Sequence, residues 1–115
     1  MKATEKGDVY SFGVLTLEII MGTHPAELLS YLAEKPTNDD LLLKDVVDPR
    51  LSFFRFKKPI LDEVALVAKI AFSCLKENPH SRPTMEQVCM DLVWTPRFYL
   101  PDQFHTITIG QLMRE

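Results

Sequence analysis

The chain has 115 residues, of which 46% are hydrophobic and 25% are charged, a composition ordinary for one globular domain. Its formal net charge of −3 gives no electrostatic reason to expect nucleic acid or an anionic membrane as a partner.

The cysteines and the N-terminus suggest a domain that works in a reducing compartment. Cys74 and Cys89 are far apart and lie inside apolar helical patterns, so we expect buried, reduced thiols. Residues 1–6 lack the hydrophobic region of a signal peptide, and no apolar run reaches the length of a membrane span. We therefore expect no membrane contact from this chain.

Residues 7–22 are the most apolar stretch of the chain. They predict a helix in which Asp8 is the N-cap and Gly22 is the left-handed residue after the end. The segment is apolar nearly all round and is too short to cross a bilayer. We therefore expect a central helix that the rest of the fold surrounds.

Three further helices follow. Pro25 suits the first position of a short helix that runs to about residue 34, with Leu28, Leu29 and Leu32 at helical spacing. Turn-forming residues at 35–40 end it. Residues 41–59 predict an irregular loop with one helical turn, held to the core by Phe53, Phe54 and Phe56.

The second of these helices is a clean amphipathic helix over residues 62–77, which Asn78 and Pro79 end. The last helix begins at a capping box, in which Thr84 and Gln87 each satisfy a first-turn amide, and buries Met85, Val88, Cys89 and Leu92. Residues 94–115 predict an extended, loosely packed or partly disordered tail. The sequence thus predicts an all-α domain over residues 1–93, about four helices around one central apolar helix, followed by an irregular tail.

No set of residues is arranged for catalysis, cofactor binding or metal binding. The four glycines are scattered, which excludes a phosphate-binding loop. The histidines are far apart, the cysteines have no neighbouring base, and loop carboxylates such as Asp48 are expected to be solvated. The histidines are His24, His80 and His105, and the other loop carboxylates considered are Asp39 and Asp40.

Two segments resemble a known family. Residues 4–14, Thr-Glu-Lys-Gly-Asp-Val-Tyr-Ser-Phe-Gly-Val, resemble the start of the F helix in the C-terminal lobe of protein kinases. Residues 74–85 are similar to the last motif of that family, and residues 45–51 resemble the loop before the H helix. The residue pattern is most similar to that of plant receptor-like serine/threonine kinases with leucine-rich repeats, and the resemblance covers roughly residues 3–93.

The resemblance gives several residues a structural role. Asp8 matches the F-helix aspartate that hydrogen-bonds the catalytic loop, and Leu15 and Ile19 match positions beneath the spine that supports adenine. Arg82 matches the arginine that pairs with the glutamate of an Ala-Pro-Glu motif. Residues 22–34 resemble the G helix, a docking surface in the family, which here would present Pro25, Leu28, Leu29 and Leu32.

The family binds ATP and Mg²⁺ with a glycine-rich loop, a strand lysine, and His-Arg-Asp and Asp-Phe-Gly motifs, none of which occurs in these 115 residues. We therefore expect a fragment of a receptor-like serine/threonine kinase that alone neither binds ATP nor transfers phosphate. Asp8 would act only as a helix cap, and Arg82, without its glutamate, would turn to solvent.

The partners implied are the missing N-terminal part of a kinase domain or other proteins. The alternative is a non-catalytic interaction module that docks on kinases or their substrates through residues 25–34. An unrelated helical domain is a third possibility, disfavoured by the joint match of the two motifs. The expected location is cytoplasmic, at the plasma membrane if the chain belongs to a parent receptor.

Overall fold

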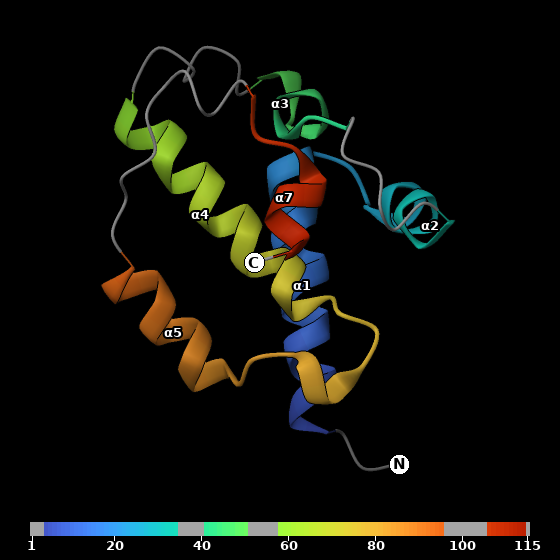
Figure 1. Cartoon of the computed structure of the whole chain (residues 1–115), viewed down its shortest axis with the longest axis vertical. Helices are drawn as coiled ribbons and strands as arrows, with labels where there is room; N and C mark the ends of the chain where they lie inside the picture. The colour runs from blue at the N-terminus through green and yellow to red at the C-terminus, as the bar shows by residue number, and fades with distance from the viewer. Residues whose placement is uncertain (1–3, 35–40, 51–57, 96–105, 115) are drawn as a thin grey trace.

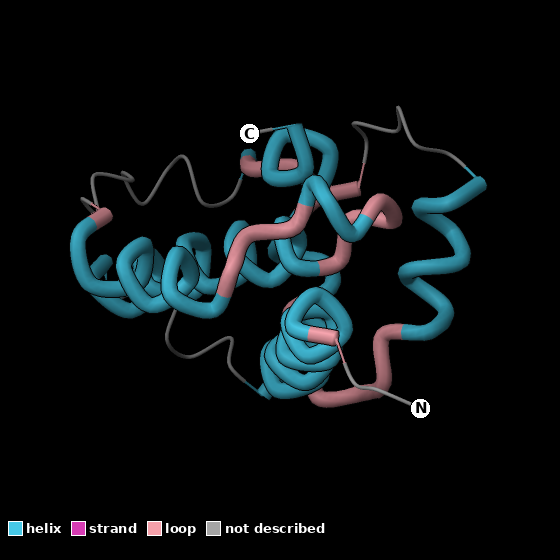
Figure 2. The backbone as a smooth tube through the Cα atoms, turned by 90° about the horizontal axis from the view of Figure 1, so that it is seen from below, coloured by secondary structure: helices cyan, strands magenta, loops and turns pink. Residues whose placement is uncertain are grey.

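The structure is a computed structural model that describes residues 4–34, 41–50, 58–95 and 106–114. These residues form helices and loops without a regular strand (Figures 1 and 2), which confirms the predicted all-α class. The helices are α1 (Glu5–Met21), α2 (Ala26–Glu34), α3 (Leu43–Val46), α4 (Lys58–Cys74), α5 (Met85–Trp94) and α7 (Ile109–Arg114), with a 3-10 turn η2 (Pro79–Ser81).

The ends of α1 are defined by Thr4 and Gly22. Thr4 is the N-cap, because its hydroxyl accepts a hydrogen bond of 2.9 Å from the Gly7 amide. The prediction that Asp8 caps the helix is wrong: Asp8 lies inside the first turn, where its amide donates to the Thr4 carbonyl at 3.1 Å. Gly22 has the expected left-handed conformation, with φ of 74°.

The centre of the fold is the pair α1 and α4, which make the most extensive contact between elements; α5 and α7 also pack on α4 (Figure 1). The pair can approach closely because Gly13 has no side chain. A Cβ atom at Gly13 would lie 2.9 Å from the Cβ of Cys74 and the Cγ of Leu75, and 3.0 Å from the Ala71 carbonyl oxygen. Gly13 thus sets the distance between the two central helices.

Burial divides α1 into two faces: the other described residues cover one face and leave the second open, as expected if the chain is a fragment of a larger kinase domain. Val9, Gly13, Leu17 and Ile20 are buried. The opposite face is open, since the side chain of Leu15 is 56% exposed and that of Ile19 is 70% exposed. The described residues therefore cover only one face of α1 along its length.

The described end of the tail belongs to the core, so the prediction of a loose tail fails for residues 106–114. Ile107, Ile109 and Leu112 are buried in the same cluster as Leu17. The segment is held by backbone hydrogen bonds from Ile109 to Leu41, at 2.8 Å, and from Leu43 to Ile107, at 2.9 Å. These form an isolated antiparallel bridge between residues 42 and 108, and α7 follows it directly.

The remaining helix predictions are correct in type and differ in detail. The helix predicted over residues 62–77 is α4, which begins and ends earlier. Thr84 caps α5 by accepting from the Gln87 amide at 3.0 Å, but the Gln87 side chain donates to Asp91 instead of completing a capping box. Phe53, Phe54, Phe56, Asp39, Asp40 and His105 lie outside the described residues.

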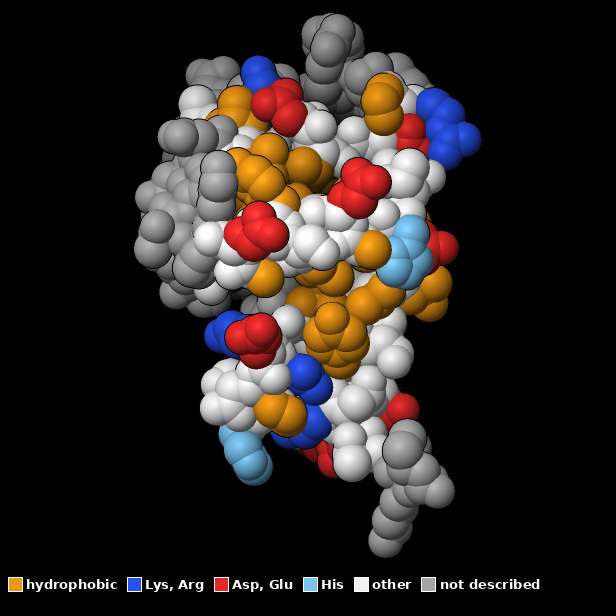
Figure 3. All heavy atoms as spheres, turned by 90° about the vertical axis from the view of Figure 1, so that its right-hand side faces the viewer, with side chains coloured by type: hydrophobic (Ala, Val, Ile, Leu, Met, Phe, Trp, Pro, Cys, Tyr) orange, Lys and Arg blue, Asp and Glu red, His pale blue; other side chains and the backbone are white. Residues whose placement is uncertain are grey.

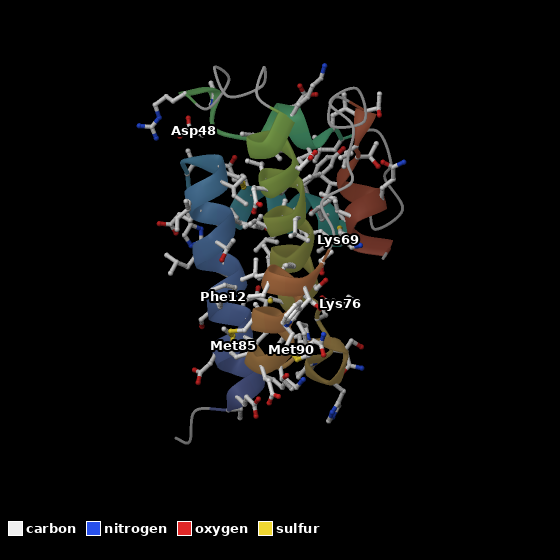
Figure 4. The ribbon with its side chains drawn as sticks, turned by 90° about the vertical axis from the view of Figure 1, so that its left-hand side faces the viewer. Phe12, Asp48, Lys69, Lys76, Met85 and Met90 are labelled. Atoms are coloured by element: carbon white, nitrogen blue, oxygen red, sulfur yellow. The ribbon has the colours of Figure 1, made fainter. Side chains whose placement is uncertain are left out.

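The two cysteines differ in their surroundings. Both are free thiols, Cys74 buried and Cys89 exposed, so the prediction of burial is wrong for Cys89. Burial raises the pKa of the Cys74 thiol. Cys74 lies in a second apolar cluster with Val9 and Val88, against which Phe12 of α1 and Met85 of α5 pack (Figure 4).

Candidate functional site

Three of the residues singled out by the kinase resemblance share one face of α1. Asp8, Leu15 and Ile19 are separated by seven and eleven positions, which brings them close to one line along a helix of 3.6 residues per turn. All three are exposed. This open face of α1 therefore presents a carboxylate near the helix start and an apolar pair towards its end.

Asp8 and Arg82 lie in different surroundings. No hydrogen bond or ion pair to another described side chain is made by the Asp8 carboxylate. The Arg82 guanidinium, in contrast, donates from Nε to the Lys76 carbonyl at 2.7 Å, from Nη1 to the Lys6 carbonyl at 3.1 Å and from Nη2 to the Glu77 carbonyl at 3.3 Å. Its Cζ atom lies 4.8 Å from the centroid of the Tyr10 ring, within cation–π range.

The prediction that Arg82 turns to solvent is therefore wrong. The carbonyls of Lys76 and Glu77 lie in the turn after α4, where backbone oxygens have no partner inside the helix and the negative end of its dipole attracts a cation. Lys6 reciprocates by donating from Nζ to the Arg82 carbonyl at 2.5 Å. Arg82 thus ties the start of α1 to the loop between α4 and α5 with backbone partners in place of a glutamate.

The residues expected to form a docking surface on α2 face mostly inwards. Pro25, Leu28 and Leu32 are buried, with exposures below 2%, of 8% and of 6% respectively. Only Leu29 is partly accessible. The prediction that α2 binds partners stays a prediction, but these three buried side chains are not available at its surface.

A cavity of about 600 Å³, which sequence reasoning missed, lies beside α2. It is lined from four elements, by residues that are far apart in the sequence, so no local pattern could indicate it. Figure 3 shows hydrophobic side chains gathered on the face that carries α2, with charged side chains around them. Its lining includes Tyr10, Leu29, Phe72, Leu75, Lys76, Glu77 and Met113.

Asp48 is a structural carboxylate, which corrects the expectation that it is solvated. It is only 8% exposed and accepts hydrogen bonds from Arg50, at 2.9 Å from the backbone amide and 2.7 Å from Nη2. These bonds hold the pKa of the Asp48 carboxyl below its usual range. The Asp48 amide donates to the Ile20 carbonyl at 2.8 Å, so this residue secures the end of α1.

The described residues contain no group of three or more His, Cys, Asp and Glu side chains that could hold a metal ion. His24 and His80 are both exposed. None of the helices in the described ranges is long and apolar enough to cross a membrane.

Comparison with known proteins identifies the family. Residues 1–92 match the family model of the protein tyrosine and serine/threonine kinases. The chain is 49% identical over 85 residues to MDIS1-interacting receptor like kinase 2 of Arabidopsis thaliana, a match that covers 74% of this chain and 8% of that protein. It is 37% identical over 93 residues to a leucine-rich repeat receptor-like serine/threonine-protein kinase of the same plant, covering 76% of this chain and 8% of the relative.

A third relative, calmodulin-binding receptor-like cytoplasmic kinase 2 of Arabidopsis thaliana, is 35% identical over 100 residues, which cover 79% of this chain and 23% of the relative. The chain thus spans less than a quarter of the length of each of these relatives. No solved structure gives a significant match. Since the family match covers most of the chain, the protein belongs to the protein tyrosine and serine/threonine kinases, as a partial kinase domain related to the receptor-like kinases of plants.

Proposed function

We propose that this chain is the scaffold part of a receptor-like serine/threonine kinase that transfers phosphate from ATP to protein hydroxyl groups. ATP and Mg²⁺ would be held by the glycine-rich, His-Arg-Asp and Asp-Phe-Gly segments of the parent domain, which this sequence lacks. The observation that carries the proposal is the open face of α1. In this role the face would support the catalytic loop and the apolar spine of the kinase.

The open face of α1 has the chemistry this role needs. Leu15 and Ile19 lie one helical turn apart and form an exposed apolar pair, which a helix face turned only to water has no reason to keep. Asp8 offers carboxylate oxygens that can accept from backbone amides of a neighbouring loop. Covering this face by another segment would bury the apolar pair and give Asp8 partners.

The receptor-like relatives suggest where such a kinase acts. We propose that the chain works in the cytoplasm, at the plasma membrane when it is part of a parent receptor. Its protein partner would then be the remainder of the kinase domain.

The proposal is tested in a chimeric kinase. In the kinase domain of MDIS1-interacting receptor like kinase 2, the segment that matches this chain is replaced by the corresponding residues of this chain. We expect the chimera to transfer labelled phosphate, and Leu15→Asp with Ile19→Asp to reduce transfer at least about a hundredfold, because two charges would be buried in an apolar contact. An active double variant would refute the scaffold role.

Met90→Asp is the matched control in the same chimera. Met90 is 47% exposed and lies on α5, a different helix from the one that carries Leu15 and Ile19 (Figure 4). Met90→Asp replaces one exposed apolar side chain by aspartate, the same kind of change that the double variant makes twice. Because Met90 does not lie on the α1 face, we expect activity within about twofold of the parent chimera. Equal losses in both variants would show that the α1 face has no special role.

The isolated chain gives an independent test. We expect the purified 115-residue protein to show no labelled phosphate transfer to a protein substrate. Turnover that Asp8→Asn abolishes would show that this chain carries catalysis itself, and the scaffold proposal would then be wrong.

A further inference from the structure

The cavity beside α2 has walls suited to a ring system. Tyr10 and Phe72 contribute aromatic rings, and Leu29, Leu75 and Met113 contribute aliphatic groups and a thioether. Aromatic rings and methionine sulfur both make favourable contacts with a bound aromatic ring. The volume of about 600 Å³ lies in the range of about 300–1,000 Å³ that is usual for small-molecule sites.

The charges around the cavity balance. Lys76 and Glu77 both line it, one positive and one negative, and neither makes an ion pair with another described residue. A ligand of net positive or net negative charge would therefore meet repulsion from one of them as well as attraction to the other. The site has no preference for a charged ligand, so the apolar walls decide what binds.

One side chain holds much of the cavity wall in place. Arg82 lies over the Tyr10 ring and binds the backbone carbonyls of Lys76 and Glu77, so three lining residues are fixed by its contacts. A wall that is held before the ligand arrives loses less conformational entropy on binding. The cavity is therefore preorganised on this side.

The far wall comes from outside the segment that matches the kinase family. Met113 belongs to α7, whereas the family match ends at residue 92. This helix is anchored in the core by Ile109 and Leu112, so Met113 is held at the cavity. The complete site is thus a property of this chain and goes beyond the scaffold role proposed above.

We propose that the cavity between α1, α2, the end of α4 and α7 binds a small, uncharged aromatic molecule. The ligand fills the space between the rings of Tyr10 and Phe72 and the side chain of Met113. Lys76 and Glu77 at the cavity orient polar groups of the ligand without setting a requirement for charge.

The test uses the full chain, labelled with ¹³C in the methionine methyl groups, and 1-naphthol as the probe. We expect a saturable shift of the Met113 methyl signal, with a dissociation constant of about 1 mM or tighter. The exposed Met90 on α5 serves as the internal reference and should not shift in the same titration. The absence of saturable change at Met113 up to the solubility of 1-naphthol would overturn the proposal.

Two tryptophan variants locate the site. Ala33 is exposed and lines the cavity, so Ala33→Trp places an indole in the binding space and should weaken 1-naphthol binding at least about tenfold. Ala26→Trp makes the same change on the same helix at an exposed position that does not line the cavity, and should change the affinity less than about twofold. Unchanged affinity in Ala33→Trp would overturn the assignment, provided that circular dichroism shows a folded variant.

A charged probe tests the chemical class. 1-Naphthoate has nearly the same shape as 1-naphthol but carries a full negative charge at neutral pH. We expect 1-naphthoate to bind at least about threefold more weakly than 1-naphthol. Its carboxylate must lose bound water, and the cavity offers no net positive charge that would compensate this cost. Tighter binding of 1-naphthoate would overturn the assignment to uncharged ligands.

Discussion

Replacing Gly13 by alanine places a methyl group where α1 and α4 approach most closely. The new Cβ would lie 2.9 Å from the Cβ of Cys74 and the Cγ of Leu75, and 3.0 Å from the Ala71 carbonyl oxygen. Carbon atoms in favourable contact are about 3.5–4.0 Å apart. Two of the three neighbours are backbone or Cβ atoms that cannot rotate away, so the helices must separate.

Two effects oppose each other in Gly13→Ala. Alanine is the better helix former by about 0.8–1.0 kcal/mol, which would stabilise α1. Overpacking of a closely packed core costs about 1–3 kcal/mol, and here it falls on the most extensive helix contact of the chain. We therefore expect the free energy of unfolding to fall by about 1–2 kcal/mol.

Urea unfolding followed by circular dichroism measures this change, and Ser11 supplies the reference. Ser11 lies in the same helix on the exposed face, so the difference between Ser11→Ala and Ser11→Gly gives the helix-propensity effect without a packing effect. We expect Ser11→Ala to be about 1 kcal/mol more stable than Ser11→Gly, and Gly13→Ala to be less stable than the parent. A gain in stability at both positions would refute the close packing of α1 on α4 at Gly13.

Three further predictions concern stability. Arg82→Ala should lower the free energy of unfolding by about 1–3 kcal/mol in urea titrations, with Arg82→Lys recovering less than half, because lysine cannot reach several carbonyls in one plane. Asp48→Asn should be less stable than the parent at pH 7, because Arg50 lowers the folded-state pKa of Asp48 and so stabilises the carboxylate. This advantage should shrink as the pH falls below about 4 and through that lowered pKa. If the two proteins differ in free energy of unfolding by the same amount at pH 3 as at pH 7, the prediction is contradicted. Ile109→Ala should cost about 2–5 kcal/mol in thermal or urea unfolding, since Ile109 has no exposed surface; a cost near zero would show that α7 is not part of the cooperative core.

Local patterns located the main helices because amphipathic spacing and turn residues act within one segment. The spacing of Leu28 and Leu32 concerns neighbours in the sequence and matches α2, whereas α4 ends at Cys74, before the stop that Asn78 and Pro79 predict. The start of α1 was misplaced because Thr4 and Asp8 are both good N-cap residues. Only the extended backbone of Thr4, with φ of −98° and ψ of 150°, distinguishes them.

The remaining features depend on contacts between distant segments. Thr108 pairs with Leu42 across 66 residues of sequence, and no local pattern indicates that pairing. The partners of Arg82 are backbone carbonyls, which every residue carries and which only the course of the chain brings together. The cavity combines Tyr10 with Met113 for the same reason. Of the candidate site, the sequence therefore indicated the α1 face but neither the Arg82 contacts nor the cavity.

The two faces of α1 separate the requirements of folding from those of function. Leu17 is 2% exposed and Leu15 is 56% exposed, although they are identical residues two positions apart on one helix. Burial of Leu17 stabilises this chain, whereas Leu15 and Ile19 contribute little because most of their surface stays in water. An apolar pair that adds little to its own fold is explained by a partner surface, which in our proposal is the remainder of the kinase domain. The all-round apolar character of α1 then reflects two contacts, one with α4 inside this chain and one with the segments that bind ATP and catalyse transfer.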